Sequence, residues 1–304
     1  MKNKAEQQNK IVEACPESSE TVFIEQELRP GKELDEAEAI NIFSQAIWKL
    51  FEDNRRIFAN SLGTDELDAV LADARVLAVE VKKEKIYRLD ELVGVRDPIK
   101  MRAYLTVVNR NILPKEAYAV VEPGTVRAHL ISVKEKKPVL FIETREETSS
   151  VYLAHSSAVK RLNSWEWGRR DVLKRMSEEL LTSADVNNEI YMRYIKGEVG
   201  PIVSERIESI FIDSLREFQK GLAAALYNHK TAVEAYPKAP VFIRSEFPLP
   251  AVIYKKRIPC DGRRVALKET ESELKASDLF SKEDVLLSEE LSKTVLQKIK
   301  WLMV

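Results

Sequence analysis

The sequence predicts a mixed α/β protein in which an α/β part comes first and a mainly helical part follows. Apolar residues recur at three- and four-residue spacing after Asp35, which is the period of an amphipathic helix. Apolar and polar residues then alternate over 66–72 and 75–82, the period of half-buried strands. From about Ser156, helical spacing dominates. The chain accordingly divides into three expected parts: a flexible tail over 1–20, an α/β domain over 21–150 and a mainly helical domain over 151–304.

The α/β part is predicted to begin with a strand and a helix. Residues 22–28 favour a short strand. Asp35 is a favoured N-cap residue, and Glu38 stands three residues later as the second member of a capping box. We expect the helix that follows to end near Asp53. Three extended segments are predicted next, at 56–60, 66–72 and 75–82.

Another helix and more strands are predicted after residue 97. Asp97-Pro98 resembles a helix start, because proline is favoured in the first turn, and a broad apolar side continues to residue 111. The remaining strands of this part are expected at 117–121, 126–133 and 139–144. The second part is predicted to hold helices at 171–181, 185–196 and 204–227, an extended run at 241–243 and a C-terminal helix at 281–302.

Composition excludes several classes of protein. The net charge is −1, so no overall basic field attracts nucleic acid. Cys15 and Cys260 match no CxxC spacing, so neither a disulfide framework nor a zinc site is expected, and a reducing compartment fits best. No apolar run approaches the roughly 20 residues of a membrane helix. We therefore expect a cytoplasmic protein without a membrane partner.

Two acidic residues and a lysine are predicted to share one face of a hairpin. If 66–72 pairs with 75–82, the register that gathers the apolar residues on one face sets Asp68 directly opposite Glu80. Opposite side chains on paired strands have Cβ atoms about 5 Å apart. Lys82 lies two residues beyond Glu80 and therefore points to the same face.

This cluster has a chemical use. Two adjacent carboxylates repel each other, and a divalent cation removes that penalty. Mg²⁺ is held by carboxylates, waters and phosphate oxygens, and it can polarise a phosphodiester and activate water. Asp68 and Glu80 are therefore the predicted ligands of Mg²⁺ or Mn²⁺, and Lys82 is predicted to stabilise charge on the phosphate. The alternative is a solvated face of a half-exposed hairpin.

The pattern formed by Asp68, Glu80 and Lys82 is similar to the D…(D/E)xK motif of the PD-(D/E)xK nuclease superfamily. The predicted order helix, strand, strand, strand, helix, strand also resembles the core of that superfamily, over about the first 120 residues. The sequence departs from the motif at Leu67, where the superfamily often has proline. The resemblance implies a metal-dependent endonuclease. It also suggests an acid from the first helix, for which Glu38 is the best candidate.

A basic cluster in the second part is the predicted nucleic-acid-binding surface. Its members are Lys160, Arg161, Trp165, Trp167, Arg169, Arg170, Lys174 and Arg175. Cations neutralise phosphates, and indoles stack on bases. The alternative is a solvated helix face whose tryptophans pack on the core.

Weaker features each have an ordinary structural explanation beside the functional one. Glu143 and Arg145 end another apolar strand, with Glu122 upstream, as a fainter copy of the nuclease motif, although an ordinary strand end accounts for them. Residues 180–197 can be aligned with a helix-turn-helix, but such helix pairs are common. His129 and the two other histidines have no metal-binding spacing, and structural roles are expected.

The sequence thus favours a nuclease that hydrolyses phosphodiester bonds, with DNA as the expected substrate and RNA not excluded. One alternative is a nucleic-acid-binding protein without catalysis. Another is a self-assembling coat or nucleocapsid-type protein, which would form homo-oligomers.

Overall fold

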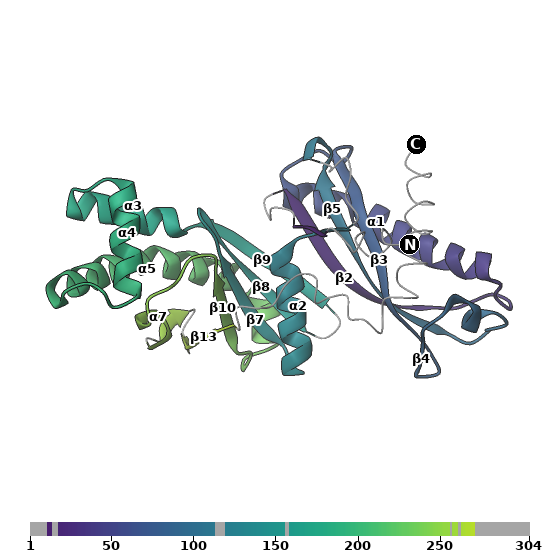
Figure 1. Ribbon diagram of the computed structural model, residues 1–304. Coiled ribbons are helices and arrows are strands. Elements are labelled where there is room, and N and C mark those ends of the chain that lie inside the picture. Colours follow the sequence, from purple (N-terminus) through teal and green to yellow (C-terminus); the bar gives the residue numbers. More distant parts are fainter. Residues whose placement is uncertain are drawn as a thin grey trace, which may run out of the picture. The chain divides into compact units, whose positions relative to one another are not determined.

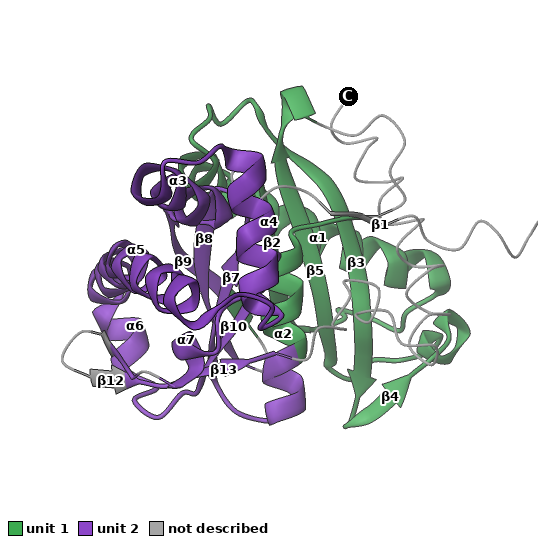
Figure 2. Cartoon of the chain, turned by 60° about the vertical axis from the view of Figure 1, so that its left-hand side comes forward, with its two compact units in different colours: residues 1–130, 157–159, 274–304 green, residues 131–156, 160–273 purple. Residues whose placement is uncertain are grey.

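The computed structural model describes residues 11–13, 18–112, 119–155, 158–255, 257–260 and 263–270 (Figure 1). Contacts divide the chain into two compact units (Figure 2). Unit 1 comprises 1–130, 157–159 and 274–304, and unit 2 comprises 131–156 and 160–273. The expected domains over 21–150 and 151–304 stay predictions, because contacts do not test whether each part folds by itself.

Unit 1 is built on a four-stranded antiparallel sheet with the order β2-β5-β3-β4. The strands are β2 (Ser19–Leu28), β3 (Ala69–Val81), β4 (Glu84–Ile86) and β5 (Ile99–Asn109). Helix α1 (Glu36–Leu62) contacts β2, β3 and β5. Two 3-10 helices, η1 (Leu89–Leu92) and η2 (Arg110–Ile112), lie in the connections.

Helix α1 begins as its sequence predicts. The Asp35 carboxylate accepts a hydrogen bond from Glu38 N at 2.8 Å, and the Glu38 carboxylate accepts one from Asp35 N at 3.2 Å. This capping box satisfies two donors of the first turn. The helix ends at Gly63, whose φ of 60° suits a residue without a side chain. It therefore continues past Asp53, and the predicted strand at 56–60 is wrong.

The core of unit 1 lies between α1 and the sheet. Strand β5 is its centre, because the alternating residues Ile99, Met101, Ala103, Leu105 and Val107 are all buried in this cluster. The intervening residues are buried on the opposite face, among them Tyr104, Thr106 and Val108.

A short parallel pair and a helix complete the described part of unit 1. Strands β1 (Ile11–Glu13) and β6 (Ala119–Val121) pair in parallel. Helix α2 (Pro123–Glu135) follows β6 and crosses the division between the units. The buried Glu122 carboxylate accepts hydrogen bonds from Gly124 N and Thr125 N, at 2.9 and 2.7 Å. These bonds cap the helix, so the strand predicted at 126–133 is wrong.

Unit 2 contains a five-stranded sheet with the order β13-β10-β7-β8-β9. The strands are β7 (Val139–Thr144), β8 (Thr148–His155), β9 (Ala158–Glu166), β10 (Val241–Ser245) and β13 (Leu267–Glu269). Strand β10 runs parallel to β7 and to β13, whereas β7 and β8 are antiparallel. A separate antiparallel pair consists of β11 (Ile258–Cys260) and β12 (Arg263–Val265).

Helices supply the other layer of unit 2. They are α3 (Arg169–Leu180), α4 (Ala184–Ile195), α5 (Pro201–Asn228), α6 (Lys230–Glu234) and α7 (Val252–Lys255). The predicted helices at 171–181, 185–196 and 204–227 are confirmed, as is the extended run at 241–243. The helices and the sheet of this unit share one core.

The hairpin predicted from 66–72 and 75–82 is wrong. Residues 69–81 form one continuous strand that pairs with β5 along its length. The sequence around Asp73 has no glycine, asparagine or proline to turn the chain. Instead, the register with β5 shifts after Leu71 and after Val76, as β-bulges do.

The helix predicted over 97–111 is also wrong, because these residues form β5. The PD-(D/E)xK core order is therefore not the observed order, and what the structure shows is a mixed α/β fold with two main sheets. Residues 11–13, 19 and 20, which belong to the predicted tail, lie in strands. The predicted C-terminal helix at 281–302 lies outside the described residues. No helix in the described ranges is long and apolar enough to cross a membrane.

Candidate functional site

The predicted metal ligands lie at opposite ends of one strand. Asp68 immediately precedes β3, and Glu80 is the second-last residue of that strand. At about 3.3 Å per residue, the two are roughly 40 Å apart, so they cannot share a cation. Glu80 instead forms an ion pair with Arg102, at 3.6 Å.

The other two predicted catalytic residues have structural roles. Lys82 lies in the two-residue turn between β3 and β4, and its Nζ is 2.9 Å from Asp97 Oδ2. Glu38 completes the capping box of α1 and forms an ion pair with Lys32. The four residues are therefore not brought together.

In the described ranges, no group of three His, Cys, Asp or Glu side chains is placed to hold a metal ion. Bound Mg²⁺ or Mn²⁺ accordingly stays a prediction from the sequence alone.

The two tryptophans of the basic cluster belong to the core of unit 2. Trp167 is buried, and its Nε1 donates hydrogen bonds to the Oγ and carbonyl oxygen of Ser214, both at 3.0 Å. The Trp165 ring centroid lies 5.6 Å from that of Phe218. A Cβ placed on Gly221 would come within 2.2 Å of the Trp165 ring, so the indole packs directly on the α5 backbone. Trp167 is therefore inaccessible to a base, and Trp165 is half-buried with its ring packed against α5 and Phe218.

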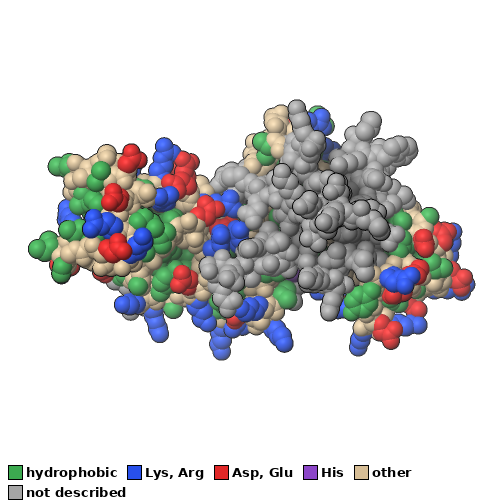
Figure 3. Space-filling view, viewed as in Figure 1, with side chains coloured by type: hydrophobic (Ala, Val, Ile, Leu, Met, Phe, Trp, Pro, Cys, Tyr) green, Lys and Arg blue, Asp and Glu red, His purple; other side chains and the backbone are tan. Residues whose placement is uncertain are grey.

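Two arginines of the basic cluster are paired with acidic or amide side chains. Arg169 contacts Asn188 and Glu146, and Arg170 pairs with Glu147. Lys160 and Lys174 are exposed, and Arg161 and Arg175 are half-buried. Figure 3 shows acidic, basic and apolar side chains intermingled over α3, α4 and α5, rather than a continuous basic surface.

The segment aligned with a helix-turn-helix is held by its own polar residues. Asn187 is fully buried and donates hydrogen bonds to Ser177 Oγ and to the Thr182 carbonyl oxygen, at 2.7 and 3.2 Å. An asparagine in this position fixes the turn between α3 and α4 and cannot reach a base.

A buried ionic cluster lies at the carboxyl ends of β7 and β10. The Glu143 carboxylate is 2.9 Å from Arg145 Nη2 and 3.1 Å from Arg244 Nη1. Ligands of α/β sheets usually lie outside such strand ends. Here the two guanidinium groups are already paired with Glu143, and Arg145 also with Glu246, and the neighbouring cavity, lined by Tyr254 and Thr270, is only about 160 Å³.

A second buried acid lies on the sheet of unit 1. Asp73 Oδ2 accepts hydrogen bonds from Tyr104 Oη at 2.7 Å and from Val120 N at 3.2 Å, and Arg75 is 3.3 Å away. Burial raises the pKa of Asp73, and the neighbouring Arg75 opposes that change. These bonds attach β6 to the bulge of β3, so Asp73 has a structural role.

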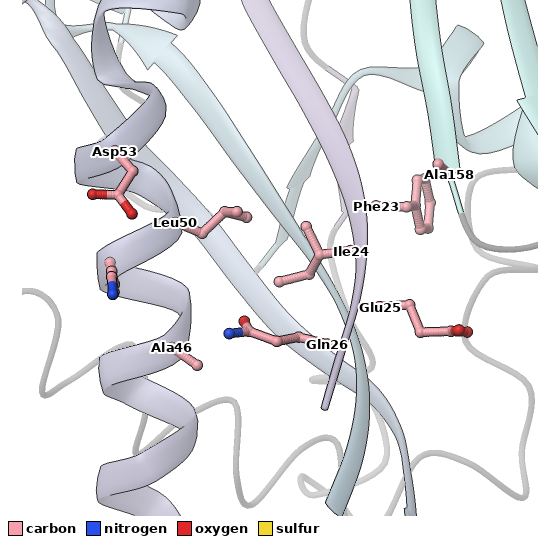
Figure 4. Close-up of a pocket in the computed structure, with 9 residues that line it drawn as sticks. Phe23, Ile24, Glu25, Gln26, Ala46, Leu50, Asp53 and Ala158 are labelled. Carbon is pink, nitrogen blue, oxygen red and sulfur yellow. The ribbon is translucent and has the colours of Figure 1, made fainter. Parts of the chain in front are cut away.

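A cavity of about 530 Å³ lies beside β2 (Figure 4). Its apolar lining comes from Ile24, Ala46 and Leu50 on the α1 side, and from Phe23 and Ala158, which lie next to each other on the other side of β2. Figure 4 shows Ile24 and Gln26 on the side of β2 that faces α1, with Phe23 and Glu25 on the opposite side. Polar groups line the remainder: Glu25, Gln26, Lys49 and Asp53.

The cavity adjoins an open edge of the sheet. Strand β2 is the terminal strand in the order β2-β5-β3-β4, and its ten residue pairs with β5 run without a bulge. Within the described ranges, no backbone group of residues 22–27 forms a hydrogen bond outside that ladder. On the opposite side of the sheet, β4 pairs only with residues 79–81, so the rest of β3 has no strand partner there among the described residues, but its register is broken by two shifts. The β2 edge is the regular one, and its outward hydrogen-bonding groups have no strand partner within the described ranges.

Sequence reasoning missed this site for a physical reason. The strand itself was predicted at 22–28, but its position at an edge depends on strand order, which has no local signal. The sole hint is compositional: Glu25 and Glu27 are charges of the kind that edge strands carry.

Comparisons with known proteins show only remote likeness. No family profile and no curated protein matches the chain. Among solved structures, the PilM-PilN type IV pilus biogenesis complex aligns at 12% identity and a TM-score of 0.41, covering 94% of this chain and 77% of the other. An archaeal actin homolog aligns at 12% identity and a TM-score of 0.35, covering 66% and 62%. A glycerol dehydratase reactivase aligns at 11% identity and 0.31, covering 94% and 57%.

The expectation of a PD-(D/E)xK nuclease is wrong. The residues of its motif are separated along β3, and the core helix expected at 97–111 is strand β5. The expected endonuclease activity is wrong for the same reason. The expected nucleic-acid partner is also wrong, because Trp165 and Trp167 pack within the protein.

Proposed function

We propose that this chain is a protein-binding adaptor that adds an extended segment of another polypeptide to the free edge of β2. The observation that carries the proposal is the edge of residues 22–27, which has no strand partner among the described residues and lies beside the 530 Å³ cavity. An edge strand presents a row of backbone donors and acceptors, and an added strand satisfies them while its side chains enter neighbouring pockets. The cavity between β2 and α1 is such a pocket.

The buried acids of the described chain support an adaptor more than an enzyme. Glu143 is neutralised by two arginines, Glu122 caps α2, and Asp73 holds β6. Each carboxylate is therefore committed to holding the fold. A reducing, cytoplasmic location remains part of the proposal, based on the cysteine spacing alone.

A display experiment tests the proposal with the full chain. Random peptides would be selected on the immobilised protein, and backbone hydrogen exchange would be measured with and without a selected peptide. We expect protection of residues 22–27, because half of their amides gain a partner on binding. Selected peptides that protect only other segments would contradict the proposal.

A matched pair of variants adds a second readout. Leu50→Trp would fill the cavity and should abolish binding of the selected peptide. Ile57→Trp adds the same ring to α1 at an exposed position that does not line the cavity, and binding should be unchanged. Equal binding by both variants would exclude the cavity as the docking site.

A further inference from the structure

Resting on the proposed function, we infer that the segment received by β2 alternates apolar and basic side chains. In a strand, successive side chains point to opposite faces, so an added strand places every second side chain on the α1 side. There it meets the apolar surface of Ile24, Ala46 and Leu50. The cavity has room for apolar side chains at this position. The side chains that the segment directs toward α1 are therefore inferred to be apolar.

The other face of the segment meets acidic side chains. Glu25 and Glu27 are two residues apart on β2, so both lie on the side opposite α1, as Figure 4 shows for Glu25. Their present partners are partly exposed cations: Lys100 is 2.9 Å from Glu25, and Arg29 is 2.9 Å from Glu27. A lysine or arginine of the added strand that lies directly opposite Glu25 or Glu27 forms a favourable cross-strand charge pair. An acidic side chain in the same place is repelled.

The length and regularity of the edge argue for a peptide rather than a small molecule. Residues 22–27 span roughly 20 Å at about 3.4 Å per residue, and no bulge interrupts them. A partner that satisfies donors and acceptors along this length must itself be an extended backbone. A second copy of this chain is the competing occupant, because an exposed strand edge can also pair with itself.

The test uses synthetic peptides with the full-length chain. The probe is Lys-Val-Lys-Val-Lys-Val-Lys, and its controls are the same residues with the valines contiguous and the peptide Glu-Val-Glu-Val-Glu-Val-Glu. We expect the probe to bind and to protect residues 22–27 from exchange. Each control should bind at least about tenfold more weakly, since misplacing one apolar side chain forfeits about 1.4 kcal/mol. Equal binding by either control would overturn the inference.

Two further measurements test separately the backbone hydrogen bonds of the added strand and its charge pairing with β2. A probe N-methylated at alternate residues keeps its side chains but cannot complete the ladder, so it should not bind. The double substitution Glu25→Gln/Glu27→Gln should weaken the probe, whereas Glu33→Gln/Glu84→Gln, which removes two exposed acids away from the edge, should not. Binding of the N-methylated probe, or equal effects of the two double variants, would overturn the inference.

The outcomes separate this inference from the proposed function. If display-selected peptides protect residues 22–27 but the Lys-Val probe does not bind, the adaptor role stands and the inferred partner chemistry falls. If sedimentation shows a dimer in which residues 22–27 are already protected, the occupant is a second copy, and the inference falls in that case also.

Discussion

Glu143 on β7 and Arg244 on β10 join two neighbouring parallel strands through an ion pair of 3.1 Å, with the carboxylate fully buried. Arg145 contacts the other oxygen of the same carboxylate. The buried Glu143 carboxylate thus contacts two guanidinium groups that are each largely shielded from water, and Arg145 has a second, more exposed partner in Glu246. Loss of the Glu143 charge would therefore affect Arg244 most.

We expect Glu143→Gln to destabilise the protein by about 3 kcal/mol, because removing one member of a buried ion pair leaves its partners without compensation. Urea unfolding followed by tryptophan fluorescence would measure the loss, since Trp165 and Trp167 lie in the same unit. The matched control is Glu147→Gln, whose pair with Arg170 is exposed and should matter by less than about 0.5 kcal/mol. Equal stabilities of the two variants would contradict this assignment.

The second prediction concerns acid stability and His129. Its ring stacks on Phe23 with centroids 4.0 Å apart, and burial, assisted by the charge of Arg102, lowers its pKa from 6.5 to about 4. The unfolded chain therefore binds a proton in this pH range that the folded chain does not. Stability should be complete above pH 6.5 and should fall as the pH drops toward 4, by up to about 3 kcal/mol.

Substitution of His129 tests the assignment. His129→Phe keeps a ring against Phe23 and removes the titrating group. The difference in unfolding free energy between wild type and variant should therefore change with pH between 6.5 and 4. A difference that is constant over this range would show that His129 does not titrate as its burial implies.

The sequence predicted those elements that have local signals. The start of α1 follows from Asp35 and Glu38, and the helical periods of α3, α4 and α5 are each recovered. Strand β5 could not be recognised in this way. Only its first four residues, Ile99 to Arg102, alternate clearly; from Ala103 to Val108 it is buried on both faces, and Asp97-Pro98 resembles a helix start.

The predicted site failed because it depended on that error. With 97–111 assigned to a helix, β5 was not considered as a partner for residues 66–82, and pairing the two halves of this segment with each other placed Asp68 opposite Glu80. Once β5 is a strand, it pairs with β3 from Ala69 to Val81, and the two acids separate. The β-bulge after Leu71 lies where the sequence predicted a hairpin turn.

The third prediction concerns the β3–β4 turn. Lys82 and Lys83 have φ values of 51° and 72°, a conformation that costs a lysine more than asparagine or glycine. We expect Lys82→Asn/Lys83→Gly to stabilise the protein by about 1 kcal/mol, even though the exposed Lys82–Asp97 pair is lost. Thermal unfolding would show a higher Tm. Lys85→Asn, in β4, removes a similar charge without a favoured turn residue, so its Tm should not rise.

The last prediction concerns Gly221 and Trp165. Gly221 lies inside α5, where alanine would ordinarily stabilise the helix by about 1 kcal/mol. A Cβ at this position would lie 2.2 Å from Trp165 Cδ1, so the indole must move. We expect Gly221→Ala to destabilise the protein by about 2 kcal/mol, because overpacking in a core exceeds the gain in helix propensity.

A double-mutant cycle separates the clash from other effects. Trp165→Leu alone should cost about 3 kcal/mol through lost packing, but in its presence Gly221→Ala should become neutral or stabilising. Urea unfolding monitored by circular dichroism would measure all four proteins without relying on the indole. Additive effects of the two substitutions would mean that Trp165 does not pack on Gly221, and the ring would again be free to contact a ligand.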